Sequence, residues 1–288
     1  MLRFLTISLL FCLILTPVNA GIRIKKLADL ESELSESSGL EYYMNKYLIT
    51  HNDSGNKAII YVINEHGKIL KEIEIKDADN DDWEDLTCSA DGTLYIGDIG
   101  NNENKREKCQ IYVVKSDFFK TKDGDVKSDK ITFEYEDQQE FPPAKAELHY
   151  DAEAIFWMKD SIYILTKCRS EPFSGRSFVY VLPDKPGKYK ARKIGEIPFC
   201  SLSWMFCSVT SADYDPKSNT LVVLLYGKII FISDFPGNRF WEGKFESHTI
   251  WNIKQREAIT FIDANNLYMS DEYSKKVGGG NLYKVTRR

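Results

Sequence analysis

The sequence has little that would anchor the mature chain in a membrane or attract a nucleic acid. Its one long apolar run lies in the first twenty residues, from Phe4 to Leu15, and is shorter than the roughly 20 residues that a membrane-spanning helix needs. Lys and Arg (38) are outnumbered by Asp and Glu (43), which gives a formal net charge of -5. This balance provides no basic face to draw nucleic acid. We therefore expect neither a nucleic-acid partner nor an integral membrane segment.

Residues 1–20 have the pattern of a secretory signal peptide. Arg3 precedes the apolar run, Pro17 ends it, and small residues occupy the cleavage-type positions up to Ala20. We expect a secreted or periplasmic monomer whose mature chain, residues 21–288, forms a single domain.

Cysteine is scarce as well. Five of the six cysteines follow residue 20, an odd number that is too thinly spread to build a disulfide scaffold, and no two are spaced as CxxC. Cys200 and Cys207 flank one short segment and are the best candidate pair; the alternative is that both are free and buried. A Gly-x-Ser-x-Gly elbow is absent, so an α/β-hydrolase serine mechanism has no support.

Sustained helical periodicity is absent too, and a repeat of short β-runs takes its place. Each unit starts with a small or acidic pair before a large apolar anchor, and a second apolar run follows the anchor by seven or eight residues. A third run follows in every unit, and the first four units add a fourth. The anchors are Leu40, Leu86, Ile155, Tyr214 and Ile259. Turn segments such as ADG and DPKSN separate the runs, as expected for antiparallel strands.

Four short antiparallel strands repeated in this way are typical of the blades of a β-propeller. We predict an all-β fold with five blades; six is the alternative, because the longer second and third units have room for extra strands. A sandwich or jelly roll would have similar strand spacing but would not explain the register of the repeat. The fifth unit has only three runs. Residues 21–27 are therefore expected to supply its outer strand and to close the ring.

Polar residues recur at two aligned positions of the repeat. Two residues before the anchors stand Ser38, Glu84, Glu153, Ala212 and Glu257, and at the far end of the second run stand Asn52, Asp98, Thr166, Leu225 and Asp271. In an antiparallel pair, the end of the second strand lies beside the start of the first. The innermost strands of all blades line one channel, so we predict that the two sets share one mouth of that channel.

Several carboxylates at one mouth repel one another unless a cation compensates them. One alternative is a hard cation, most suitably Ca²⁺, held by carboxylate and amide oxygens. Its predicted ligands are Glu84, Asp98, Glu153, Glu257, Asp271 and Asn52. The other alternative is a structural ring in which Lys167, Lys254, Arg256 and His51 pair with the glutamates. In an enzyme, Glu153, Glu257 or His51 would act as the general base.

Five short motifs carry a family resemblance: ESSGLEY, DWEDL, LYIGDIGNN, DAEAI and REAITF. With them the chain resembles the SdiA-regulated (YjiK-like) and phytase-esterase-like propellers, within the group that includes gluconolactonases and calcium-dependent phosphotriesterases. The resemblance implies a channel calcium held by Glu84, Glu153, Glu257, Asp98 and Asp271, and hydrolysis of lactones or organophosphate esters. The chain departs from the gluconolactonase pattern, because its glutamates precede Asp-Leu or Ala-Ile rather than Gly-Pro.

The expected function is thus binding or hydrolysis of a small ester, lactone or phosphoester at an acidic, calcium-holding mouth. The alternative is a non-enzymatic extracellular recognition module that binds a protein or glycan on one propeller face.

Overall fold

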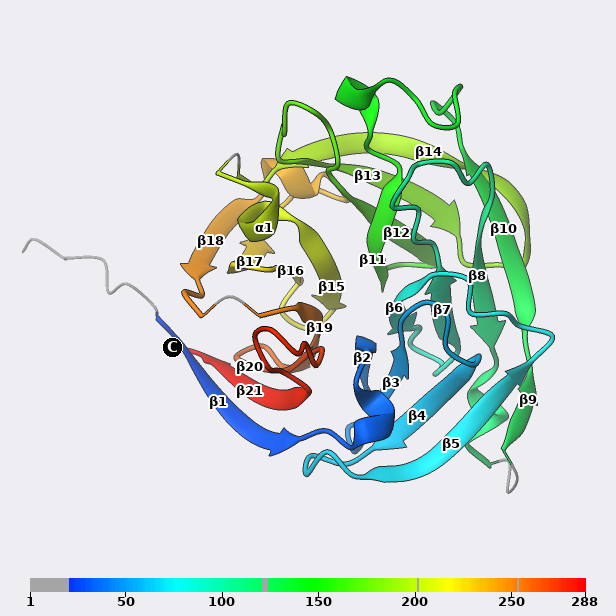
Figure 1. Ribbon diagram of the computed structural model, residues 1–288, viewed down its shortest axis with the longest axis vertical. Helices are drawn as coiled ribbons and strands as arrows, with labels where there is room; N and C mark the ends of the chain where they lie inside the picture. The colour runs from blue at the N-terminus through cyan, green and yellow to red at the C-terminus, as the bar shows by residue number, and fades with distance from the viewer. Residues whose placement is uncertain (1–20, 121–123, 201, 253) are drawn as a thin grey trace, which may run out of the picture.

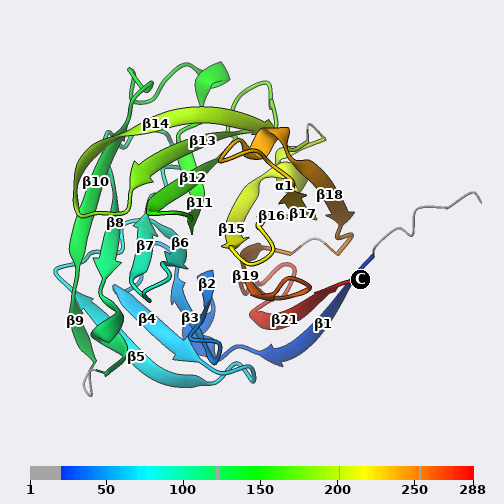
Figure 2. The same ribbon diagram turned by 180° about the vertical axis from the view of Figure 1, so that it is seen from behind.

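The computed structural model describes residues 21–120, 124–200, 202–252 and 254–288. The predicted signal peptide lies outside these residues and stays a prediction. Sheets radiate from a common centre, which the innermost strand of each sheet faces (Figures 1 and 2). The predicted all-β propeller architecture is confirmed.

Within the described residues the strands form five antiparallel four-stranded units, which we call blades. The first contains β2 (Ser37–Tyr43), β3 (Tyr47–Asn52), β4 (Ile59–Ile63) and β5 (Ile69–Lys76). The second contains β6 (Trp83–Cys88), β7 (Leu94–Asp98), β8 (Cys109–Val114) and β10 (Asp129–Tyr135), and the third β11 (Asp151–Trp157), β12 (Ser161–Lys167), β13 (Arg176–Pro183) and β14 (Gly187–Pro198). The fourth contains β15 (Val209–Asp215), β16 (Thr220–Leu225), β17 (Lys228–Ser233) and β18 (Lys244–Thr249), and the fifth β19 (Arg256–Asp263), β20 (Asn266–Asp271), β21 (Asn281–Arg287) and β1 (Ile22–Asp29).

Smaller elements decorate this ring. The short strand β9 (Asp125–Lys127) runs parallel to β5, and β10 pairs in parallel with β14, which joins the outer edges of the second and third blades. The helical turns are η1 (Ser32–Leu34), η2 (Ser116–Lys120), η3 (Lys145–Glu147), α1 (Trp204–Cys207) and η4 (Phe240–Glu242).

The ring is closed by the N-terminal strand. β1 pairs antiparallel with β21 from Ile22 opposite Arg287 to Asp29 opposite Asn281. The backbone N–H of Arg288 also donates to the carbonyl of Gly21 at 3.0 Å. The prediction that residues 21–27 complete the last blade is therefore confirmed, and the blade edge that would otherwise be open is covered.

The hydrophobic core is divided among the spaces between neighbouring blades. One cluster, for example, joins Ile49 and Ile60 of the first blade to Trp83 and Tyr112 of the second, and another joins Leu40 to Tyr268 across the closing junction. Central strands are buried on both faces, as in β16, where all residues are buried. This is why their sequences are continuous apolar runs rather than alternating ones.

Cys200 and Cys207 form a disulfide, which confirms their predicted pairing and is compatible with an extracellular or periplasmic protein. Cys88, Cys109 and Cys168 are free thiols. Among the residues that the structure describes, no helix has the length and apolar character needed to cross a membrane.

Candidate functional site

The register of the innermost strands brings the two predicted sets of residues to the same mouth of the channel. Trp83 at the start of β6 lies opposite Asp98 at the end of β7, and Arg256 lies opposite Asp271. In the first blade, Ser37 lies opposite Asn52. Because β2, β6, β11, β15 and β19 contact one another in ring order, these strand ends converge from all blades.

A β-bulge interrupts the start of every innermost strand. The pairing shifts by one residue around Gly39, Glu84, Glu153, Thr210 and Glu257. A bulge residue has no partner on the neighbouring strand and its side chain is re-aimed. All three channel glutamates are therefore bulge residues. In the first blade the bulge residue is Gly39 rather than Ser38, which the repeat alignment placed at this position. In the fourth blade it is Thr210 rather than Ala212.

Gly39 itself shows why the first blade contributes no side chain at this position. Its φ is +65°, a conformation that favours glycine, and an added Cβ would lie 2.6 Å from Nε2 of His51.

Glu84, Glu153 and Glu257 are buried and surround one space. Burial raises the pKa of Glu84 well above its ordinary value, and the charges of Glu153 and Asp53 raise it further. Burial also raises the pKa of Glu257; Lys167 lowers it, while Glu272 and Glu153 raise it. Glu84 and Glu257 thus both respond to the charge of Glu153, as expected from their convergence on the channel.

One half of the mouth carries its own cations. Lys167, at the end of β12, places Nζ 2.9 Å from Oε2 of Glu153 and 3.3 Å from the hydroxyl of Tyr226. Arg169 bonds Asp151 through Nε at 2.6 Å and lies 3.7 Å from Oε1 of Glu153. Burial nevertheless raises the pKa of Glu153 to about 8. We call Glu153, Glu257 and Lys167 the paired half.

The other half has carboxylates without such partners. Asp53, Asp82 and Glu84 each offer an oxygen, and these oxygens lie within 4.8 Å of one another. In the described parts of the chain, no Lys, Arg or His nitrogen lies within ion-pair distance of any of the three. Burial, together with the charges of Asp53 and Asp151, raises the pKa of Asp82 to about 6. We call these three residues the open cluster.

Asp53 and Asp82 were not among the predicted ligands. Asp53 follows β3 directly, and Asp82 stands in the acidic run that precedes β6. The repeat alignment singled out only positions shared between blades, and these two aspartates lie in loops just outside it. The signal that would have found them is their place next to Asn52 and Glu84 in the chain.

Gly100 brings the backbone close to the open cluster. Its N–H and that of Ile99 both donate to the carbonyl of Asp82 at 3.1 Å. A Cβ at this position would collide with the carboxylate of Asp82 and with Oε1 of Glu84. Glycine is therefore required for the close approach of this turn to the two acids.

Asn52, at the end of β3, directly precedes Asp53 of the open cluster. Its Nδ2 donates to the carbonyl of Glu33 at 2.7 Å, while its Oδ1 is buried and has no hydrogen-bond partner in the described residues. Asn80 donates to the carbonyls of Asn52 and Asp53 at 3.0 and 2.9 Å. The backbone of the predicted ligand Asn52 is thus fixed, and its amide oxygen is available.

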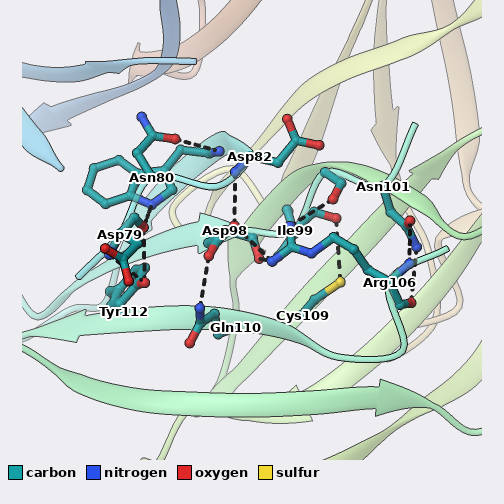
Figure 3. Close-up of polar contacts among 12 residues, drawn as sticks. Asp79, Asn80, Asp82, Asp98, Ile99, Asn101, Arg106, Cys109, Gln110 and Tyr112 are labelled. Atoms are coloured by element: carbon teal, nitrogen blue, oxygen red, sulfur yellow. Dashed lines mark hydrogen bonds and ion pairs between the residues drawn. The ribbon is translucent and has the colours of Figure 1, made fainter. Parts of the chain in front are cut away.

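Asp98 and Asp271, both predicted ligands, are bonded within their own blades. Figure 3 shows the carboxylate of Asp98 between the backbone N–H of Asp82 at 3.1 Å, Arg106 at 3.0 Å and Gln110 at 3.0 Å. Asp271 accepts bonds from the N–H and the side chain of Asn281 and from the hydroxyl of Tyr283, at 2.6 to 2.9 Å. These two aspartates brace the rim rather than join the open cluster.

His51, a predicted base, is buried inside the first blade. Its Nδ1 donates to the carbonyl of Asn52 at 3.1 Å, and its ring meets Trp83 edge-on with centroids 5.4 Å apart. Burial lowers the pKa of His51 to about 4, so the ring is neutral at neutral pH. The imidazole is thus packed within the first blade and does not lie among the channel carboxyls.

No protein-family model matches the chain, and no curated protein matches it in sequence. Solved structures do match. A gluconolactonase from Xanthomonas campestris is 11% identical, with 93% of this chain and 90% of that chain covered and a TM-score of 0.50. The PQQ-bound aldose sugar dehydrogenase from Streptomyces coelicolor is 8% identical, with 93% and 99% covered and a TM-score of 0.52. The chain is a β-propeller.

Exposed aromatic side chains lie in the segments that connect strands at the acidic end of the propeller, one of them in α1. Trp204 (55% exposed) and Trp251 (82%) precede the innermost strands β15 and β19, and Tyr273 (56%) follows β20. In an antiparallel blade, the loop before the innermost strand and the loop after the second strand lie at the same end of the blade. The acidic mouth of the propeller is therefore flanked by planar apolar surfaces.

Proposed function

We propose that the propeller holds a divalent cation, Ca²⁺ by preference, in the open cluster, and that it binds and hydrolyses a small ester, lactone or phosphoester at this mouth. The observation that carries the proposal is the approach of three carboxylate oxygens within 4.8 Å without a protein cation in the described residues. Like charges held this close, with Glu84 buried and Asp53 and Asp82 half-buried, are costly unless a cation compensates them. A gluconolactonase is among the proteins of known structure with this fold.

The residues present fit such an ion. Calcium takes oxygen ligands from carboxylates and amide side chains, and the donors of Asp53, Asp82 and Glu84 are all of this kind. The unpartnered, buried Oδ1 of Asn52 is a fourth oxygen next to Asp53. Gly100 keeps the side of the cluster formed by Asp82 and Glu84 free of any side chain.

A bound divalent cation polarises a carbonyl or phosphoryl oxygen and lowers the pKa of a bound water. The chain supplies the proton transfer. Glu257 is buried, and burial raises its pKa well above the ordinary value, with the charge of Glu153 adding to this effect, so its carboxyl holds a proton more strongly than a free glutamate and is suited to proton transfer. Lys167 fixes the carboxylate of Glu153 at 2.9 Å and keeps a positive charge on the paired half. Glu257 is therefore the proposed general base, with Glu153 held next to it.

The three exposed aromatic side chains that flank the mouth favour a second candidate function, non-enzymatic recognition of a glycan. Trp204, Trp251 and Tyr273 offer exposed rings around the mouth. Aromatic rings of this kind combine a planar apolar face with a polar edge, which suits binding surfaces. In this case the open cluster and its ion would be structural.

Two measurements test the proposal and separate the candidates. Elemental analysis and melting with and without a chelator test for the ion; absence of bound metal together with identical melting would refute the cation. Hydrolysis of a panel of lactones, aryl esters and phosphotriesters then tests catalysis. We expect Glu257→Gln to lose hydrolysis and to keep the ion, while Glu72→Gln on the exposed edge of β5 serves as the matched control. Equal background rates in all proteins, with the ion bound, would leave the glycan candidate.

A further inference from the structure

A second pocket, which shares Arg169 and Trp204 with the edge of the channel mouth, contains one of the free thiols. It has a volume of about 310 Å³. Its lining includes Cys168, Arg169, Pro172, Phe173 and Trp204. Cys168 follows β12 directly, and the opposite wall belongs to α1 and Ser208. The lining is largely apolar, so the pocket suits a small apolar or aromatic group.

The thiol is surrounded by groups that hydrogen-bond sulfur. Its Sγ lies 3.2 Å from the hydroxyl of Ser170 and 3.2 Å from the hydroxyl of Ser174. Ser170 is fixed in turn, because it donates to the carbonyl of Pro172 at 2.9 Å and accepts from the N–H of Ser174 at 3.1 Å. The two hydroxyls are therefore held in place around the sulfur atom.

His149 completes this arrangement. Only 7% of it is exposed, its ring packs on Phe178 with centroids 4.4 Å apart, and its Nδ1 has no hydrogen-bond partner in the part of the chain that the structure describes. Burial raises the pKa of Cys168, but the hydrogen-bonding contacts of the sulfur with His149, Ser170 and Ser174 lower it more, to about 5. A Cys beside a His in a partly open pocket is the environment of a reactive thiolate.

The other free thiols differ. Burial raises the pKa of Cys109 to about 12, despite the opposing effect of Arg106. Burial and the charge of Glu41 raise the pKa of Cys88 well above its ordinary value. These two thiols are therefore protonated at neutral pH and poor nucleophiles, which makes them internal controls for Cys168.

We propose that Cys168 is a covalent modification site, at which its sulfur exchanges with a small disulfide that carries an apolar or aromatic group. The thiolate attacks one sulfur of the incoming disulfide, and a new S–S bond forms between Cys168 and that half. The original S–S bond breaks, and the other half leaves as a thiolate. The exchange needs no further oxidant and does not depend on the cation proposed for the channel.

The pocket supports this chemistry in two ways. Phe173 and Trp204 provide apolar contacts for the half that stays attached. His149 acts as a positioning residue, because its imidazole lies beside the sulfur and favours the anionic form. The proposal thus assigns a separate role to a histidine and a thiol that the channel chemistry does not use.

The test uses 4,4′-dithiodipyridine, an aromatic disulfide whose released thiopyridone absorbs light, on the native full chain. We expect one thiol to react quickly near pH 6, and mass mapping to place the adduct on Cys168. The rate should fall as the pH is lowered through about 5, where the thiolate is protonated. Cys168→Ser should abolish the fast phase, and Cys109→Ser should leave it unchanged.

His149→Gln tests the positioning role separately. Gln is similar in size but removes the imidazole that hydrogen-bonds the sulfur, so the midpoint of the pH profile should move upward. The rate near pH 6 should fall about tenfold or more, since fewer thiols are ionised. An unchanged profile would overturn the role of His149.

Other outcomes would overturn the proposal itself. These are an adduct on Cys88 or Cys109 with Cys168 untouched, an ordinary midpoint above pH 8, or no reaction until the protein unfolds. Circular dichroism and melting check that each variant is folded. If Cys168→Ser does not fold, the adduct map and pH profile of the unaltered protein decide alone.

Discussion

Glu84 and Asp85 are consecutive residues of β6 and are both buried carboxylates, yet their surroundings are opposite. Asp85 accepts bonds from the N–H groups of Leu86 and Ile155 at 3.0 and 3.1 Å, and from the hydroxyl of Ser211 at 3.3 Å. No hydrogen bond is seen for the side chain of Glu84 in the described residues. One carboxylate joins the second, third and fourth blades, and the other faces the channel with no partner.

The hydrogen-bond partners of a buried carboxylate distinguish the two kinds in this ring. Asp213 behaves like Asp85, because it accepts bonds from Thr260 at 3.1 Å and from the N–H of Phe261 at 2.7 Å on the next blade. A buried carboxylate whose oxygens are bonded by backbone N–H groups holds blades together. Glu84 of the open cluster has no such bond to its side chain in the described residues, which makes it a candidate ligand rather than a link between blades.

The largest effect is expected from removing a structural carboxylate. Asp85→Ala would leave the N–H of Ile155 and the hydroxyl of Ser211 without their bonds, at about 1–3 kcal/mol for each buried orphan. We expect the free energy of unfolding in urea to fall by about 4 kcal/mol. Glu84→Gln, the adjacent control, should leave the metal-free protein equally or more stable. An equal loss in both variants would remove the distinction.

Lys167→Met tests the paired half. Removing one partner of a buried ion pair leaves an uncompensated charge, and Glu153 has only Arg169 as a further cation in the described residues, at 3.7 Å. We expect a loss of about 3 kcal/mol in urea unfolding near pH 8. Lys254→Met, which removes a longer contact of 3.5 Å to Asp271 at the rim, should cost less. The reverse order would show that Lys167 does not compensate the glutamates.

The pH dependence of stability should show the burial of Glu153, which raises its pKa even though Lys167 is beside it. The pKa of Glu153 is raised to about 8, so the folded state binds more protons than the unfolded state between about pH 4.5 and 8. Metal-free protein should therefore be most stable below about pH 4.5 as far as this group is concerned, and should lose up to about 5 kcal/mol as the pH rises from there to 8. Melting scans with added Ca²⁺ should show a flatter profile, since binding displaces protons. A metal-free profile that rises over this range would contradict the assignment.

Gly100→Ala should give the smallest effect and the most local one. The new methyl group would meet Asp82 and Glu84 and should weaken calcium binding about tenfold, or about 1.4 kcal/mol. Isothermal titration measures this change. Gly55→Ala has no atom within 4 Å of the added carbon and controls for the substitution, although its positive φ makes a loss of stability expected there. Equal calcium affinity in Gly100→Ala and the parent would place the ion elsewhere.

The ring could be predicted from the sequence, because a repeat of β-runs has few ways to bury its apolar faces. The convergence of Glu84, Glu153 and Glu257 on its channel followed from the same repeat. The sequence did not reveal the bulges. A bulge adds one residue to a strand without changing its composition, so the alignment missed Gly39 and Thr210 as the equivalent positions.

Other features depend on the direction in which a side chain points, which its position in the sequence does not give. Asp98 and Asp271 were correctly placed at the strand ends, but Gln110 and Asn281, which bond them, come from outer strands that no spacing rule relates to the channel. His51 stands beside Asn52 in the chain, yet a strand sends neighbouring side chains to opposite faces. Asp53 and Asp82 lie in loops outside the repeat, where periodicity gives no information.

The pairing of β1 with β21 also bears on how fast the ring can fold. Ile22 and Arg287 face each other in the folded molecule, although almost the whole described chain lies between them. Contacts between residues so far apart in sequence slow folding, because the long intervening chain has to be ordered before they form.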